Sequence, residues 1–367
     1  MQRSEFYRGA RIVVTGAAGT VGRALVDKLL GLGAAEVRAL DNNEGELFLC
    51  SEQRRDDQRF RPFVTDVRDA EGLARLFRGM DYAFHSAALK HVQMCETSPF
   101  STVATNVDGV ENVIRAGLAG TVKRVLFASS DKAVNPTNVM GSSKLLGERL
   151  FSAAMAMGRL EGDTIFASTR FGNVAGSRGS VIPVFVQQIV RGGPVTLTDR
   201  RMTRFVMTLD RATLMLLNCL ARAHGGEVFV TKMPALRVVD LAEVMVAALA
   251  PFFGHDSKRI EIAEVGAQPG EKLYEELLSL EEARRATEEA GLLIVTAPYV
   301  APLPKQPVRE VRNSAEEIPM TKDEIAQFLT EPHVLPDNLR DYLLKGGGVP
   351  RSTARQPADR GSRARAK

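Results

Sequence analysis

Short apolar runs alternate with longer segments of helical periodicity through the first half of the chain. The runs lie at residues 11–15 (RIVVT), 36–40 (EVRAL), 61–65 (RPFVT), 81–85 (DYAFH) and 124–130 (RVLFASS). Between them, apolar residues recur every three or four positions, as at Leu25, Leu29 and Leu30 and again within residues 107–114. This alternation predicts parallel βαβ units with right-handed crossovers and helices that cover a buried, doubly wound sheet.

The pattern changes in the second half. A further strand is indicated at residues 164–174, after which the alternation weakens and Gly and Pro gather at residues 192–194. An amphipathic helix is predicted at residues 238–249, and a glycine turn followed by a helix at residues 267–278. Because 367 residues exceed a comfortable single core, a large domain with a smaller appended one is the natural expectation.

Three glycines stand between the first strand and the first helix, in VTGAAGTVGRAL. Gly16 would permit a tight turn, Gly19 would let the backbone approach a pyrophosphate, and Gly22 would let helix and strand pack closely. Thr20 and Val21 begin the helix, whose N-terminus offers NH donors and positive potential. The GxxGxxG spacing resembles that of extended short-chain reductases; a plain glycine turn is the alternative.

Asp41 ends the second strand, where a carboxylate can accept both ribose hydroxyls of NAD and repel the 2′-phosphate of NADP. The cofactor is therefore predicted to be NAD, with NADP less favoured, although Arg38 lies near and Asp41 could instead cap a helix. Four further residues follow the third and fourth strands and are expected to border the adenine and the nicotinamide ribose: Asp66, Val67, Ala87 and Ala88.

We accordingly expect an α/β protein with a doubly wound parallel Rossmann sheet and a smaller C-terminal substrate-binding α/β domain. The NAD-binding Rossmann domain is predicted at residues 9–195, with later segments free to return to it. The mainly substrate-binding domain is predicted at residues 196–345, and a disordered basic tail at residues 346–367.

Charge and cysteine content narrow the class of protein. The net charge of +4 resides in the tail, which carries six basic residues against one acid. We interpret the tail as a solvated extension rather than a polyanion-binding arm, so no nucleic-acid partner is expected. Three cysteines without CxxC spacing, and no signal-peptide pattern, favour a reducing cytoplasm without disulfides or a metal site. The longest apolar stretch, residues 244–253, is shorter than the roughly 18 residues of a membrane span, so none is expected.

The candidate chemistry follows the fifth strand. Short-chain reductases join a Ser or Thr there to a YxxxK on the next helix, where Tyr and Lys share a face. Here Ser130 is followed by Asp131 and Lys132, Met140 occupies the Tyr position, and Lys144 comes four residues later. A thioether accepts no proton, so either catalysis is lost or Asp131 and Lys132 serve as acid and base, with the pKa of the amine lowered by Lys144 and the nicotinamide. A surface Asp-Lys turn is the alternative.

Several segments together resemble one family. They are residues 88–96 (ALKHVQMCE), 129–150 (SSDKAVNPTNVMGSSKLLGERL), 170–185 (RFGNVAGSRGSVIPVF), 198–212 (TDRRMTRFVMTLDRA), 225–242 (GGEVFVTKMPALRVVDLA) and 268–278 (QPGEKLYEELL). In this order they look like the UDP-N-acetylglucosamine 4,6-dehydratases of bacterial glycan synthesis, including a membrane-anchored branch in which Met replaces the Tyr. The resemblance spans about residues 10 to 300. The anchoring helices of that branch are not expected in this chain.

The resemblance implies oxidation of the hexose at C4 by NAD, elimination of water across C5 and C6, and return of the hydride to C6. Lys132 would remove the C5 proton, Asp131 would protonate the departing 6-hydroxyl, Lys144 would hold the nicotinamide ribose and Ser130 would orient the C4 oxygen. The C4 hydroxyl proton would pass to Asp131 or to a water chain in place of Met140.

The resemblance also implies which residues contact the UDP-sugar: Lys90, His91, Asn173, Arg178, Arg204 and Glu271. Arginine forks suit a pyrophosphate, whereas Lys90 could instead be solvated and Glu271 could serve a helix N-terminus. A C4 or C5 epimerase and a non-catalytic NAD-binding sensor or scaffold remain open as alternatives. Because helices that flank such a sheet commonly build dimers, a homo-oligomer is expected.

Overall fold

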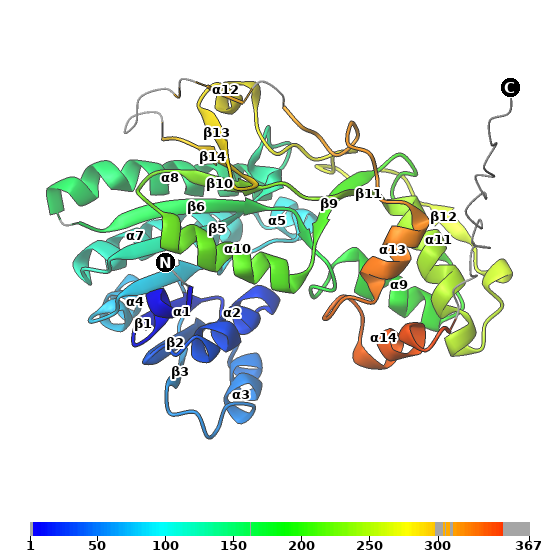
Figure 1. The fold of residues 1–367 in the computed structure, drawn as a ribbon, viewed down its shortest axis with the longest axis horizontal. Helices are drawn as coiled ribbons and strands as arrows, with labels where there is room; N and C mark the ends of the chain where they lie inside the picture. Colours follow the sequence, from blue (N-terminus) through cyan, green and yellow to red (C-terminus); the bar gives the residue numbers. More distant parts are fainter. Residues whose placement is uncertain (1–2, 162, 298–303, 305, 309–310, 348–367) are drawn as a thin grey trace, which may run out of the picture.

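The computed structural model describes residues 3–161, 163–297, 304, 306–308 and 311–347. Its centre is a nine-stranded sheet in the order β13-β14-β10-β6-β5-β4-β1-β2-β3, of which the seven strands from β10 to β3 run parallel (Figure 1). The strands are β1 (Arg11–Thr15), β2 (Glu36–Asp41), β3 (Phe60–Val64), β4 (Tyr82–His85), β5 (Arg124–Ser130), β6 (Ile165–Phe171), β10 (Val228–Thr231), β13 (Ala286–Glu289) and β14 (Leu292–Val295). The predicted α/β class and the parallel sheet are confirmed.

Helices cover both faces of this sheet. The alternation of side chains along β1 sends Ile12 and Val14 into the core on one face and Val13 into the core on the other. The first face is covered by α2 (Thr20–Gly31) and α10 (Leu209–Arg222), and the second by α4 (Ala70–Phe77), α7 (Gly109–Ala119) and α8 (Val139–Glu161). Shorter helices complete this part of the chain: α1 (Arg3–Tyr7), α3 (Glu44–Glu52), α5 (Val92–Thr97), α6 (Pro99–Val103) and α12 (Leu280–Ala283).

A separate hydrophobic core lies beyond the carboxyl ends of the central strands. It is built by α9 (Val181–Val190), α11 (Val238–Leu249), α13 (Lys322–Leu329) and α14 (Asp337–Leu344), which gather on the right of Figure 1. Two small sheets accompany it: β7 (Asn173–Val174), β9 (Thr203–Met207) and β11 (Ala235–Arg237), and β8 (Val195–Leu197) with β12 (Ile262–Glu264). The chain crosses between the two cores several times, since α9 precedes residue 195 and α10 follows it. The domain division at that residue stays a proposal.

The prediction of a helix within residues 267–278 is wrong. After a turn near Gly270, the segment runs without helical structure and pairs with a distant stretch of chain. The backbone NH of Glu275 donates to Ser314 Oγ at 3.0 Å, and the NH of Leu277 donates to the carbonyl of Arg312 at 3.1 Å. These partners satisfy the backbone without a helix, because tertiary contacts override the local periodicity.

Two expectations concern cysteines and membrane spans. Cys50, Cys95 and Cys219 are all buried and unpaired. Over the described ranges, no helix is both long and apolar enough to cross a bilayer. The basic tail lies, from residue 348 onward, outside the described residues.

Candidate active site

Two adjoining cavities open where the parallel strands end. The larger, of about 580 Å³, borders the loops that follow β1, β2, β4 and β5, and the smaller, of about 190 Å³, lies against the segment around Gly270. Lys132 and Asn173 line both cavities. The carboxyl edge of an open parallel sheet is where such folds bind ligands, so the two cavities are the candidate site.

The glycine loop forms one wall of the larger cavity, where Gly16, Gly19, Thr20, Val21 and Gly22 all lie. Gly16 has a positive φ of 70°, and a Cβ there would lie 2.6 Å from the backbone nitrogen of Ala87. A Cβ at Gly22 would lie 2.1 Å from the carbonyl oxygen of Gly16. Side chains are therefore excluded, which leaves the backbone NH groups at the start of α2 free to face an anion.

Asp41 lies at the end of β2 on the rim of the larger cavity. Its Oδ2 accepts from the backbone NH of Ala18 at 2.9 Å, and its Oδ1 from that of Asn43 at 3.0 Å. Arg38 points elsewhere, because its guanidinium donates to Glu36 and to the backbone carbonyl of Leu76. A carboxylate fixed beside the glycine loop, from which Arg38 points away, fits the ribose of an NAD-type cofactor.

The other predicted cofactor residues divide into two groups. Val67, Ala87 and Ala88 line the larger cavity. Asp66 is absent from its lining. Arg68 donates to both carboxylate oxygens of Asp66, and these hydrogen bonds hold the pKa of Asp66 well below its ordinary value. The glycine loop, the helix start and Asp41 together form a cradle that fits a dinucleotide, and Asp66 is not part of its lining.

Met140 and Lys144 lie on the same face of α8 and both line the larger cavity. Lys144 is buried, donates to the carbonyl of Ala128 at 2.9 Å and lies 4.7 Å above the ring of Phe127. Burial lowers the pKa of Lys144 to about 8, and the carboxylate of Glu148 partly opposes that shift. The buried amine is thus close to its titration point near neutral pH.

Asp131 and Lys132 form a single 3₁₀ turn directly after β5. Lys132 Nζ and Ser130 Oγ both donate to Asp131 Oδ1, at 3.1 and 2.9 Å. Asp131 is buried and lines neither cavity, and its Oδ2 has no partner among the described residues. Ser130 does line the larger cavity, so it stands between that cavity and the carboxylate.

The expectation that Lys144 lowers the pKa of Lys132 is wrong. Burial acts to lower that pKa, but the carboxylates of Asp131 and Glu275 outweigh it and raise the pKa above its ordinary value. Glu275 Oε1 lies 3.2 Å from Lys132 Nζ, and the Nζ also donates to Asn173 Oδ1 at 3.4 Å. The group proposed as a base is therefore an ammonium ion held by several acceptors.

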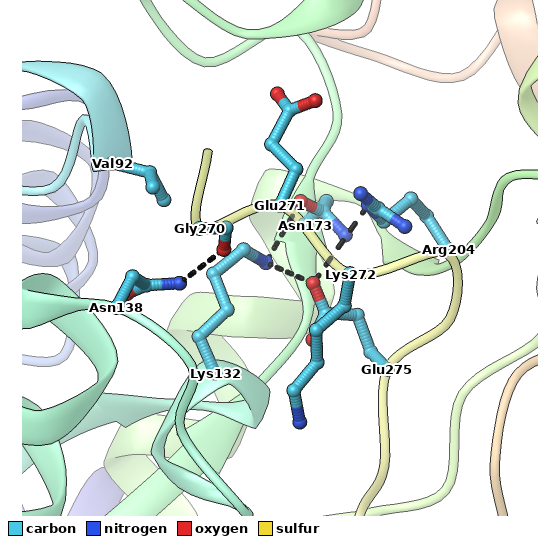
Figure 2. A pocket seen from close by; sticks show the side chains of 9 residues that line it. All are labelled: Val92, Lys132, Asn138, Asn173, Arg204, Gly270, Glu271, Lys272 and Glu275. Carbon is cyan, nitrogen blue, oxygen red and sulfur yellow. Dashed lines mark hydrogen bonds and ion pairs between the residues drawn. The ribbon is translucent and has the colours of Figure 1, made fainter. Parts of the chain in front are cut away.

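The smaller cavity brings together residues far apart in the sequence (Figure 2). Arg204 from β9 and Glu271 line it, as does Glu275, which the sequence analysis did not single out. Figure 2 shows Lys132 bonded to both Asn173 and Glu275, with Arg204 Nε 3.8 Å from Glu275 Oε1. Only the family-like segment at residues 268–278 could have drawn attention to Glu275, and there a helix was expected.

Lys90, His91 and Arg178 form a second group of predicted substrate residues. Lys90 and His91 line the larger cavity, and burial lowers the pKa of each. Arg178 lines neither cavity: its guanidinium donates to the carbonyl of Ala18 at 2.6 Å and pairs with Glu46 at 2.8 Å. Arg178 thus holds the glycine loop through the Ala18 carbonyl, and the backbone carbonyl of Arg178 accepts a hydrogen bond from Lys90 Nζ.

Comparison with known sequences gives a family and named relatives. The family model described as polysaccharide biosynthesis protein matches residues 12–297. A protein of Methanocaldococcus jannaschii described as an uncharacterized membrane protein is 43% identical over 329 residues, covering 89% of this chain and 97% of its own length. A UDP-glucose 4-epimerase of Rickettsia conorii is 39% identical over 284 residues, covering 76% of this chain and 80% of its own.

Solved structures agree on the fold. Pen from Bacillus thuringiensis aligns with a TM-score of 0.85 at 37% identity, covering 90% of this chain and all of that one. DesIV, a dTDP-glucose 4,6-dehydratase from Streptomyces venezuelae solved with NAD bound, aligns with a TM-score of 0.64 at 25% identity, covering 72% of this chain and 86% of that one. Each of these is a protein to which the chain is similar.

Proposed function

Because the chain belongs to the polysaccharide biosynthesis protein family, we propose that it is an NAD-dependent nucleotide-sugar 4,6-dehydratase. Its proposed substrate is UDP-N-acetylglucosamine and its proposed product UDP-2-acetamido-2,6-dideoxy-4-hexulose, with C5 either retained or inverted. The broader class, a nucleotide-sugar dehydratase or epimerase with an NAD-type cofactor, is supported by the named relatives and by the dehydratase solved with NAD. The dehydratase assignment rests on the residues of the site.

The residues assigned to the cofactor are those of the cradle. The NH groups at the start of α2, after Gly19, would hold the pyrophosphate, Asp41 the adenosine ribose and Lys144 the nicotinamide ribose. When bound, NAD supplies a hydride acceptor for C4 and a hydride donor for C6. The small side chain of Ala87, after β4, leaves room beneath the ribose.

Lys132 carries the dehydratase proposal, since it is a lysine that lines both the cofactor-sized and the smaller cavity. A ketone at C4 acidifies the C5 hydrogen, and an amine within reach can then remove it. Asp131 supplies the proton with which the 6-hydroxyl leaves as water. Lys132 afterwards returns its proton to C5, so neither residue is consumed.

Ser130 gives Asp131 access to the substrate and stands in for the missing phenol. Met140 can accept no proton, whereas Ser130 Oγ lines the larger cavity and donates to Asp131 Oδ1 at 2.9 Å. In the proposed relay, the C4 hydroxyl proton passes to Ser130 as the serine proton moves to Asp131. The same proton later leaves with the 6-hydroxyl, which balances the loss of one water per turnover.

The sugar nucleotide is assigned to the smaller cavity and the adjoining part of the larger one. We assign Arg204 and Lys90 to its phosphates and Asn173 and His91 to the hexose, because all four residues line these cavities. Glu271 also lines the smaller cavity, and in Figure 2 its carboxylate points away from Lys132 and Glu275, so that a ribose hydroxyl could donate to it. Arg178 would reach a pyrophosphate only by leaving Glu46.

A nucleotide-sugar 4-epimerase is the second candidate, which the Rickettsia relative favours. Mass spectrometry of the purified protein incubated with NAD and UDP-N-acetylglucosamine separates the two. A dehydratase lowers the mass of the nucleotide sugar by one water, whereas an epimerase leaves it unchanged. NAD binding without turnover of any UDP-sugar would favour the sensor or scaffold.

A further inference from the structure

Glu275 is a buried carboxylate that the proposed mechanism leaves unused. Its side chain is 3% exposed, and its Oε1 lies 3.2 Å from Lys132 Nζ. Its Oε2 is buried and has no partner within the described ranges. An unpartnered carboxylate oxygen inside a protein is costly when ionised and much less so when protonated. A cost of this kind beside the proposed base calls for a function.

The fold fixes Glu275 in place from both sides. Its backbone NH donates to Ser314 Oγ and its carbonyl accepts from the NH of Ser314 at 2.9 Å. Ser314 is bonded in turn to Thr203 Oγ1 at 2.8 Å, and the NH of Thr203 donates to the carbonyl of Leu273 at 2.9 Å. The carboxylate is thus carried by a backbone with little freedom to withdraw from Lys132.

Few charged groups face this pair. Asp131 contributes from the turn that carries Lys132, and Arg204 from β9 lies 3.8 Å from Glu275 Oε1. On the segment of Glu275 itself, Lys272 and Glu276 pair with each other at 3.2 Å, and Glu271 lines the same cavity without a charged partner among the described ion pairs. Lys132 therefore has two carboxylates beside it, and each of them has one oxygen without a partner among the described residues.

An ammonium ion cannot remove a proton from carbon, so Lys132 must lose a proton before it serves as the base at C5. Water is a poor acceptor for that proton once substrate fills a cavity of about 190 Å³. Asp131 is already assigned to the proton that leaves with the 6-hydroxyl. Glu275 is the remaining carboxylate within contact of Nζ.

We propose that Glu275 accepts the proton of Lys132 and holds it through the turnover, so that Lys132 enters the reaction as a neutral amine. The Nζ–H bond breaks, an Oε1–H bond forms, and the nitrogen keeps its electron pair for the C5 proton. The ion pair becomes a neutral pair of the same total charge, a change that exclusion of water favours. Glu275 is a positioning residue, since it acts through Lys132, and the inference rests on the proposed function.

A shared proton gives a distinctive dependence on pH. In the wild type, the transfer between Lys132 and Glu275 exchanges no proton with solvent, so kcat/KM is flat with respect to this pair across the neutral range. In Glu275→Gln, Lys132 must release its proton to solvent instead. Activity should then fall about tenfold for each pH unit below the pKa of Lys132 and recover as the pH rises.

The experiment compares Glu275→Gln with Glu276→Gln in the NAD-loaded protein. The control changes the neighbouring glutamate, which bonds Lys272 and Asn135 rather than Lys132. Product formation from UDP-N-acetylglucosamine gives kcat/KM against pH, and substrate deuterated at C5 gives the isotope effect on proton removal. We expect a rising profile and a larger isotope effect in Glu275→Gln, with a wild-type profile in Glu276→Gln.

Two results would overturn the proposal. One is a Glu275→Gln profile as flat and as high as the wild type, and the other is an equal loss at every pH, which a purely structural role would give. If Glu275→Gln does not fold, Glu275→Asp keeps an acid one methylene shorter and must retain the flat profile at a reduced rate; a rising profile there refutes the proposal. A wild type that forms no dehydrated product at any pH refutes the proposed function instead.

Discussion

Replacing Arg170 with leucine is the most demanding test of how the fold supports the site. Arg170 on β6 is fully buried and grips two carboxylates: Glu148 on α8, at 2.6 and 2.8 Å, and Glu282 on α12, at 2.6 and 2.9 Å. Glu148 comes one turn after Lys144 on the same helix. The arginine therefore ties the helix that carries the proposed ribose lysine to the sheet.

The expected cost follows from what Arg170→Leu leaves behind. Removing one partner of a buried ion pair typically destabilises a protein by about 3–5 kcal/mol, and here two carboxylates would lose their counterion. A loss of this size is a large share of the roughly 5–15 kcal/mol by which domains are stable. Unpaired Glu282 would take up a proton to limit the cost, which makes the effect depend on pH.

The sign of that dependence can be worked out for Glu282. Burial acts to raise its pKa, but hydrogen bonds and charge from Arg170 outweigh burial and lower it to about 2, from an ordinary value of 4.5. A carboxyl with a lowered pKa stabilises the fold above its unfolded pKa, and that contribution is lost as the pH falls from 4.5 towards 2. In Arg170→Leu the contribution is absent, so the gap between variant and wild type should narrow on acidification.

Urea denaturation followed by circular dichroism measures the effect. Arg201→Leu is the matched control, because Arg201 also contacts a carboxylate, that of Asp199, at 2.6 Å, but its side chain is 76% exposed. We expect a large drop in the denaturation midpoint for Arg170→Leu at neutral pH and little change for the control. Equal midpoints for the two variants, or a gap that widens as the pH falls, would refute this reasoning.

Three further changes probe the site. Gly16→Ala adds a Cβ 2.6 Å from the Ala87 nitrogen at a φ of 70°, so calorimetry should show NAD binding weakened at least about tenfold. Gly31→Ala, which has open space around its Cβ, should bind NAD as the wild type does. Equal affinities in the two variants would contradict the assignment of the glycine loop to the cofactor. Asp41→Asn should raise the affinity for NADP relative to NAD by roughly tenfold, since the repulsion between the Asp41 carboxylate and the 2′-phosphate is removed. An unchanged ratio of the two affinities would contradict the assignment of Asp41 to the adenosine ribose. Lys132→Ala should abolish dehydration while NAD still binds. Full activity in this variant would contradict the assignment of Lys132 as the base.

The sequence predicted best the parts of the site that are local in the chain. The glycine loop and Asp41 could be recognised because a strand, a turn and a helix start follow one another within a few dozen residues. The spacing of Met140 and Lys144 likewise placed both on one helix face, and they line one cavity. Short-range geometry of this kind is dictated by backbone periodicity alone.

What the sequence could not supply depends on contacts across the fold. Glu275 meets Lys132 only because the backbone around Glu275 pairs with Ser314 instead of forming the predicted helix. That meeting reverses the expected direction of the pKa shift at Lys132. The burial of Asp131 behind Ser130 is equally invisible to a one-dimensional pattern, since it depends on how the strands beyond β5 pack.

The central claim is that this chain removes water from a nucleotide sugar. Proton NMR of the purified protein incubated with NAD and UDP-N-acetylglucosamine tests it most directly. The account predicts a new methyl doublet at C6 as the signals of the 6-hydroxymethyl group disappear. A change confined to the C4 signals, with the 6-hydroxymethyl group intact, would contradict the account and identify an epimerase.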